Sequence, residues 1–125
     1  MTEEVKKLME KAEHALAVAE KLMSEDYAPD AASKVYYSMF YAAQALLKSA
    51  GLDVIKHSAV EASLGHNFAK TGKLDPKFHR MLIDARKIRE IADYDIDEEI
   101  VEPVATLKIE EGKAFLSEIK KLLGI

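Results

Sequence analysis

Cysteine is absent from this chain of 125 residues. Without it there is no disulfide framework, no thiolate metal site and no thiol nucleophile. The chain also lacks a run of about eighteen apolar residues, so no transmembrane helix is predicted. The amino-terminal residues do not show the basic and then apolar order of a signal peptide. We therefore expect a cytoplasmic location.

The chain has few positive charges: 18 Lys and Arg residues against 22 Asp and Glu residues give a net charge of -4. Most domains that bind duplex DNA carry a basic surface, so general duplex DNA binding is not expected. A local site for a nucleotide or RNA remains compatible with this charge. The chain has no Gly-rich phosphate loop and no recognisable Ser-His-Asp set.

The four histidines show no i,i+4 pair of the kind that binds a metal on one helix. They are His14, His57, His66 and His79. An acidic run from Asp93 to Glu99 lacks the glycine and the terminal glutamate of a calcium loop, and we interpret it as a solvated helix end. The sequence thus predicts no metal site and no cofactor.

Hydrophobic residues make up 49% of the chain and charged residues 32%, as in a soluble globular protein. At this length one domain buries roughly two thirds of its unfolded surface. We predict a single domain over residues 1–125.

Five segments carry apolar residues at helical spacing, and none shows the alternation of a strand. The loops between them are short, which favours antiparallel packing of neighbouring helices. We predict an all-α fold, an antiparallel four-helix up-and-down bundle with a short additional helix. The expected segments begin at Thr2, at Asp30 as N-cap, at His57 and Ser58, at Asp75 with Pro76, and at Pro103, and they end near Met23, Gly51, Gly72, Asp93 and Gly124.

The pattern also predicts which side chains are buried in the outer segments. The apolar stripe of the last helix is expected to hold Val104, Leu107, Phe115, Leu116, Ile119, Leu122 and Leu123. Gly112 is expected to loosen that helix locally. His14 and His79 are expected on solvated faces.

The segment 33–48 is apolar and aromatic on every side. Its core-facing residues are Val35, Tyr36, Met39, Ala43, Leu46 and Leu47. Tyr37 and Tyr41 project from the opposite side and call for a second contact, either with another helix of the chain or with a partner molecule. The rings of Tyr36, Tyr37 and Tyr41 could also stack on a base.

Arg89 lies at the edge of the fourth apolar stripe, with Arg86 and Asp93 on the same arc. In the structural interpretation Arg89 pairs with Asp93 at i,i+4, assisted by a tyrosine hydroxyl. In the functional interpretation the two arginines present planar forks to phosphate oxygens. His57, near a helix start, either caps that helix or binds an anion with its backbone donors.

Three blocks together resemble the HEPN domain family. They are ASKVYYSMFYAAQALL at 32–47, KHS at 56–58 and RKIREIADY at 86–94, in that family's order. The resemblance implies a bundle of four long helices plus a short one, a symmetric homodimer and pairing with a minimal nucleotidyltransferase that acts as antitoxin.

Many members of that family are metal-independent ribonucleases whose motif is an arginine followed by a histidine four to six residues later. Here Arg89 matches the arginine, but Tyr94 stands at the expected histidine position. Tyrosine, with an ordinary pKa near 10, is a poor proton shuttle at neutral pH. The catalytic candidates are Arg89, Asp93 and Tyr94, with His57 as a further substitute.

These patterns favour a nucleotide- or RNA-phosphate-binding module, a homodimer that works with a nucleotidyltransferase in a toxin-antitoxin-like pair. The predicted binding residues are Arg86, Arg89, His57, Ser33, Tyr37 and Tyr41. Two alternatives remain open: an endoribonuclease toxin with a degenerate motif, and a purely structural dimerisation protein.

Overall fold

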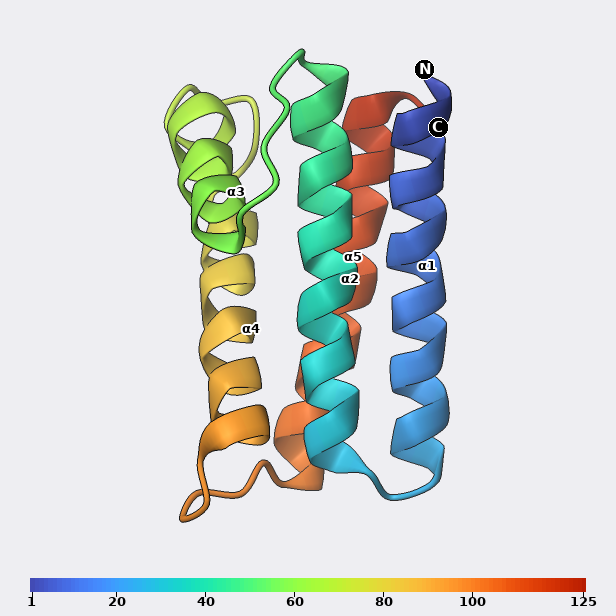
Figure 1. Ribbon diagram of the computed structural model, residues 1–125, viewed down its shortest axis with the longest axis vertical. Coiled ribbons are helices and arrows are strands. Elements are labelled where there is room, and N and C mark those ends of the chain that lie inside the picture. The colour runs from blue at the N-terminus through green and yellow to red at the C-terminus, as the bar shows by residue number, and fades with distance from the viewer.

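Five α-helices and one π-helical segment make up the computed structural model, which describes residues 1–125 and contains no strand. The four long helices run up and down along the long axis, and the short α3 lies beside one end of α4 (Figure 1). The predicted fold class is confirmed. No helix combines the length and apolar character needed to cross a bilayer. The elements are α1 (Glu3–Ser24), α2 (Ala28–Ser49), α3 (His57–Leu64), the π-helical segment Gly65–Ala69, α4 (Pro76–Tyr94) and α5 (Glu102–Leu123).

Several helix ends are set by the residues that the sequence indicated. The Thr2 hydroxyl accepts a hydrogen bond from an α1 backbone N–H at 3.3 Å, and the Asp75 carboxylate accepts one at the start of α4 at 3.0 Å. These caps satisfy N–H groups that have no partner within the helix. Gly51 and Gly124 follow α2 and α5 with φ of +82° and +78°, a conformation that favours glycine.

The start of α2 corrects one prediction. Asp30 is not its N-cap, because the helix already begins at Ala28. Pro29 lies in the first turn, where its fixed φ suits a helix and its missing N–H costs no hydrogen bond. Asp30 therefore sits inside the first turn, where its negative charge is favourable beside the helix dipole.

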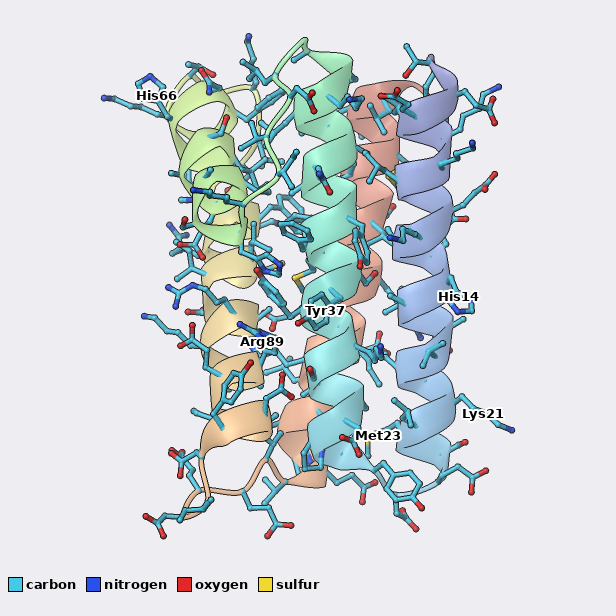
Figure 2. The ribbon with its side chains drawn as sticks, viewed as in Figure 1. His14, Lys21, Met23, Tyr37, His66 and Arg89 are labelled. Atoms are coloured by element: carbon cyan, nitrogen blue, oxygen red, sulfur yellow. The ribbon has the colours of Figure 1, made fainter.

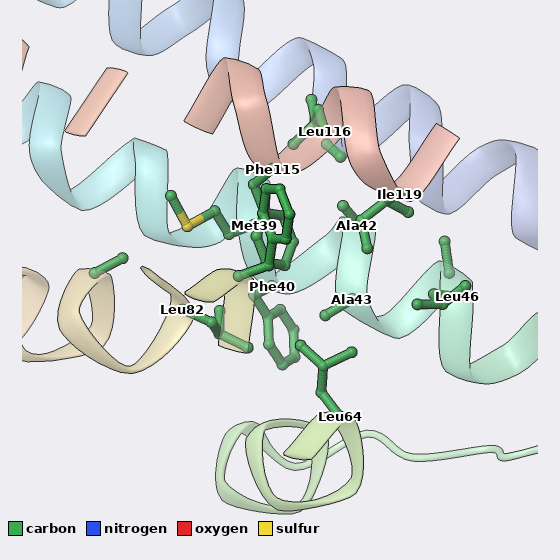
Figure 3. Packing of buried hydrophobic residues seen from close by; sticks show 14 of the residues in the cluster. Met39, Phe40, Ala42, Ala43, Leu46, Leu64, Leu82, Phe115, Leu116 and Ile119 are labelled. Atoms are coloured by element: carbon green, nitrogen blue, oxygen red, sulfur yellow. The ribbon is translucent and has the colours of Figure 1, made fainter. Parts of the chain in front are cut away.

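The predicted central position of α2 is confirmed, since this helix contacts each of the other four. Its burial is not complete, because Tyr37 and Tyr41 are only half-buried along one side. Met39 and Phe40 lie between α2, α4 and α5, close to Leu82 and Phe115 (Figure 3). All six residues predicted to face the core are buried. This central position fixes where the side chains of α2 emerge, and hence where the candidate site lies.

The buried stripe of α5 differs from the prediction. Leu107 is 56% exposed and Leu122 is 40% exposed, whereas Lys108 is buried. The aliphatic stem of Lys108 covers apolar neighbours while its ammonium pairs with Glu111 at 2.9 Å. The inward face of α5 thus includes Lys108, whereas Leu107 faces solvent.

Gly112 does not loosen α5, contrary to the prediction. It lies at a close helix crossing, where a Cβ atom would stand 3.1 Å from side-chain atoms of both Leu16 and Val35. The absence of a side chain lets α5 approach α1 and α2 closely.

His79 was expected in solvent, and this is also wrong. Its ring is half-buried, and Nε2 donates a hydrogen bond to the Glu61 carbonyl oxygen at 2.9 Å. Gly65 makes room for the ring, because a Cβ at that position would come within 2.6 Å of it. His79 therefore ties α4 to α3.

Candidate functional site

Arg89 of α4 points toward α2 and lies among three tyrosine rings, as Figure 2 shows for Tyr37. Its guanidinium carbon is 5.2 Å from the ring centre of Tyr36, 5.7 Å from that of Tyr37 and 5.8 Å from that of Tyr94. We call these three residues the tyrosine cluster. Only 14% of the Arg89 side chain is exposed. The electron-rich ring faces favour a cation at this distance.

The hydrogen-bonding groups of Arg89 are largely unused. Nη1 donates to the Tyr37 hydroxyl at 3.4 Å and lies 3.6 Å from Asp93 Oδ2, and both distances are long. Nε is buried and has no hydrogen-bond partner. A guanidinium has five N–H donors, and of these the Nε donor is left without an acceptor.

Asp93 connects Arg89 to the start of α2. Its Oδ2 atom accepts a hydrogen bond from the Ser33 hydroxyl at 3.3 Å. The predicted i,i+4 pair of Arg89 with Asp93 and the predicted help from a tyrosine hydroxyl are both present. The structure thus brings together Ser33, Tyr37, Arg89 and Asp93 from the predicted set.

The charge of Arg89 is maintained. Burial lowers the pKa of Arg89, but the neighbouring hydroxyls of Tyr37, Tyr94 and Tyr36 outweigh that effect and raise the pKa above its ordinary value. The site therefore holds a permanent positive charge in partly desolvated surroundings.

His57 is the first residue of α3 and packs against the same cluster. Its ring stacks on Phe40 at a centroid distance of 4.1 Å, and its Nδ1 atom is 2.7 Å from the Tyr36 hydroxyl oxygen. Burial of the packed side, followed by the positive charge of Arg89, lowers the pKa of His57. The imidazole is therefore neutral at pH 7.

Tyr36 is also a member of the site, although the helical spacing predicted it on the core-facing side. Burial raises the pKa of Tyr36 to about 12, although the nearby Arg89 charge acts in the opposite direction. Its hydroxyl stays protonated at neutral pH and joins His57 to the tyrosine cluster. Only the tyrosine-rich pattern of the segment pointed to it, because its partner His57 lies 21 residues away.

Arg86 does not join Arg89. Its Nε atom is 2.8 Å from Glu61 Oε1, and its Nη1 atom is 3.0 Å from Glu90 Oε1. These hydrogen bonds raise the pKa of Arg86 and balance its charge. Its predicted role as a second phosphate ligand stays a prediction, and the structure ties the side chain to two carboxylates.

The remaining candidates lie at the edge of the site. Tyr94, the last residue of α4, is 72% exposed and covers one side of Arg89. Tyr41 lies one turn after Tyr37 on α2 and is half-buried between α1 and α2. The acidic run is exposed, and within it the Asp95 carboxylate accepts backbone hydrogen bonds from Asp97 and Glu98, so it forms a solvated helix end as predicted.

The arrangement has a definite chemical capacity. A partly buried, permanently charged arginine with free donors can bind a phosphate oxygen. A neutral imidazole beside it can accept or donate a proton near pH 7. No three side chains of His, Asp or Glu converge on one point as metal ligands would.

Comparisons with known proteins find matches that cover almost the whole chain. The model of the HEPN domain family matches residues 5–125. The protein named "Putative toxin MJ0142" of Methanocaldococcus jannaschii is 38% identical over 120 residues, which is 96% of this chain and 82% of that protein.

Two further relatives agree with this match. "Putative toxin MJ0605" of the same organism is 32% identical over 97% of this chain and 90% of its own length. A "UPF0332 protein" of Thermotoga maritima is 33% identical over 90% of this chain and 86% of its own length. The family model and these relatives cover nearly the whole chain, which therefore belongs to the HEPN domain family.

Proposed function

We propose that this chain binds the phosphate of a nucleotide or an RNA at Arg89, acting as a homodimer. One observation carries the proposal: Arg89 is held between tyrosine rings with its Nε donor buried and unpartnered. An unsatisfied buried donor costs about 1–3 kcal/mol, and a phosphate oxygen would remove that cost.

The surroundings of Arg89 suit an exchange of partners. Asp93 is 3.6 Å away and shares its oxygen with Ser33, so it holds the guanidinium weakly. A phosphate accepts two parallel N–H bonds from a guanidinium and binds more strongly than a distant carboxylate. The hydroxyls of Ser33 and Tyr37 can then serve as additional polar contacts.

Apolar exposure next to this site supports the dimer. Tyr94 is 72% exposed and Ile96 is 97% exposed at the end of α4, beside the half-buried Ile91. Such neighbouring apolar groups are typical of a surface that another molecule covers. A second copy placed there would shield Arg89 from water.

Calorimetric titration with mononucleotides and short RNAs tests the binding. The matched pair of variants is Arg89→Ala and Arg80→Ala, since Arg80 lies on the same helix but is exposed and forms no ion pair. We expect Arg89→Ala to weaken binding by about tenfold or more, the value of a charge-assisted hydrogen bond, and Arg80→Ala to bind as the parent does. Equal affinities of all three proteins would contradict the proposal.

We further propose that the chain is the toxin of a toxin-antitoxin-like pair with a minimal nucleotidyltransferase. Support comes from the relatives with toxin in their names. Induced expression in a bacterial host should arrest growth, Arg89→Ala should relieve the arrest, and co-expression of a minimal nucleotidyltransferase partner should also relieve it. Normal growth with a confirmed high level of the folded parent chain would contradict this role.

A second candidate function, RNA cleavage, is favoured by the position of His57. His57 and Arg89 lie at 5.9 Å and 5.7 Å from the ring centre of Tyr37. The tautomer with its proton on Nδ1 donates to the Tyr36 oxygen and leaves Nε2 as a base. A ribose 2′-oxygen would bond to the adjacent phosphorus as the bond from phosphorus to the 5′-oxygen breaks.

His57 Nε2 takes the proton of the 2′-hydroxyl, and Arg89 stabilises the charge that develops on the phosphate oxygens. Water protonates the departing 5′-oxygen, and the hydroxide that remains takes the proton back from His57. A labelled RNA incubated with the parent, with His57→Gln and with Arg89→Ala tests this function. Cleavage by the parent alone supports a ribonuclease function. Equal cleavage by all three proteins would show a contaminating nuclease and would contradict that function.

A further inference from the structure

A groove of about 420 Å³ lies on the surface where α1 packs against α2. It is lined in part by Tyr37, which Figure 2 labels. Lys11 and His14 of α1 and Lys34, Tyr37 and Tyr41 of α2 line it, together with two small apolar residues of α1. The volume lies within the usual range for sites that bind small ligands, about 300–1,000 Å³.

Two lysines stand over the two tyrosine rings of this groove. Lys11 Nζ is 4.7 Å from the ring centre of Tyr41, and Lys34 Nζ is 6.0 Å from that of Tyr37. A cation above a tyrosine at an exposed site is held only weakly, and the long lysine stem lets it swing away. Each ring face is therefore available to a flat group.

No carboxylate lines the groove, and neither lysine forms an ion pair. Lysines elsewhere in the chain do pair: Lys48 with Glu4 and Asp53, and Lys120 with Glu13. The chain has a net charge of -4, but Lys11 and Lys34, with no carboxylate partner, make this groove locally positive. An anionic ligand fits the charge of the groove.

We infer that the groove between α1 and α2 is a subsite for single-stranded RNA, in which a base stacks on Tyr41 while Lys11 and Lys34 contact the adjoining phosphates. Proteins bind single strands by combining such ring faces with cations that follow the backbone. A protein partner fits less well, because lysine is depleted at the centres of protein interfaces.

Tyr37 connects this groove with the Arg89 site. Its ring lines the groove beside Lys34, and its hydroxyl accepts a hydrogen bond from Arg89 at 3.4 Å. One strand crossing α2 can therefore reach both positive sites. The inference rests on the proposed function at Arg89 and extends it from one phosphate to a length of chain.

Fluorescence anisotropy with a labelled single-stranded oligouridylate of about eight nucleotides tests the subsite. The variants are the double substitution Lys11→Gln with Lys34→Gln, the single substitution Arg89→Ala, and Lys121→Gln as a control that removes one positive charge from another helix. Lys121 is an exposed lysine of α5, which lies behind α2 in the view of Figure 1. Thermal unfolding of each variant establishes that it is folded.

We expect the double variant to bind at least about tenfold more weakly and to lower the slope of log affinity against log salt by about 1 to 2. Lys121→Gln should bind as the parent does. Tyr41→Leu should weaken binding and Tyr41→Phe should preserve it, because stacking needs the ring and not the hydroxyl.

The outcomes separate this inference from the proposal at Arg89. If Arg89→Ala weakens binding and the double variant does not, the subsite is overturned and the Arg89 site stands. If the double variant weakens binding and Arg89→Ala does not, the subsite stands alone. A parent that does not bind the oligonucleotide, a double variant no weaker than Lys121→Gln, or a double variant that loses only dimerisation overturns the subsite.

Discussion

At the scale of single residues, two arginines on one helix have opposite environments. Arg86 is paired with two carboxylates, whereas Arg89 keeps a buried donor without a partner. The sequence placed both on one arc of α4 but did not separate their roles. Glu61, the partner that makes the difference, is 25 residues from Arg86 in the chain, and a helical wheel contains no such contact.

The depressed pKa of His57 makes a prediction about stability. In the folded chain burial and the Arg89 charge disfavour the imidazolium, so the folded state binds its proton less readily than the unfolded state. His57 therefore contributes to stability at pH values above its pKa in the unfolded chain, near 6.5. This contribution is lost as the pH falls through its pKa in the folded chain. Urea unfolding at pH 7 and pH 5 should show a larger loss for the parent than for His57→Gln.

The effect of His57 should be small because one side of its ring faces water. Identical pH dependence of the parent and His57→Gln would show that the packed ring titrates as a free one.

At the scale of helices, most limits could be predicted because their signals are local. Thr2, Asp75 and the three glycines with positive φ act within a turn of their own position. The errors have tertiary causes: Lys108 is buried because Glu111 and its neighbours accommodate it, and His79 is held by a carbonyl of another helix. Contacts between distant segments decide these cases, and periodicity alone does not reveal them.

The close packing at Gly112 leads to a prediction about stability. Substitution Gly112→Leu should destabilise the bundle by about 1–3 kcal/mol, because its Cβ alone would come within 3.1 Å of Leu16 and Val35. Ala114→Leu, at an exposed position of the same helix, is the control and should change the free energy of unfolding by about 0.5 kcal/mol at most. Chemical unfolding measures both, and equal effects would mean that α5 is not in close contact with α1 and α2 here.

At the scale of the whole molecule, the candidate site lies where α2, α3 and α4 meet. The resemblance to a family and the tyrosine-rich helix predicted its main elements, Arg89, Asp93, Tyr37 and Ser33. The link from His57 to Tyr36 could not be predicted, because it depends on how α3 packs against α2. Fold and approximate site were therefore accessible from the sequence, and the chemistry within the site was not.

The proposed homodimer gives a prediction for the whole molecule. Substitution Ile96→Asp should shift the mass measured by light scattering from that of a dimer toward the 13.9 kDa of one chain, because a charge there opposes burial. Ile125→Asp is matched to it, since Ile125 is 57% exposed at the carboxyl terminus, which Figure 1 marks at the opposite end of the bundle from the loop after α4. It should leave the mass unchanged. A parent chain that is monomeric at tens of micromolar would contradict the dimer.

The most direct measurement uses the Nε–H signals of the arginines in a ¹⁵N nuclear magnetic resonance spectrum. The chain has Arg80, Arg86 and Arg89 and no other arginine, so the signals can be assigned by single substitutions. On addition of a short single-stranded RNA, the account predicts that the Arg89 signal shifts as its unpartnered Nε gains a phosphate oxygen, while the Arg80 signal stays in place. An Arg89 signal that does not move under conditions in which the RNA is bound would contradict it.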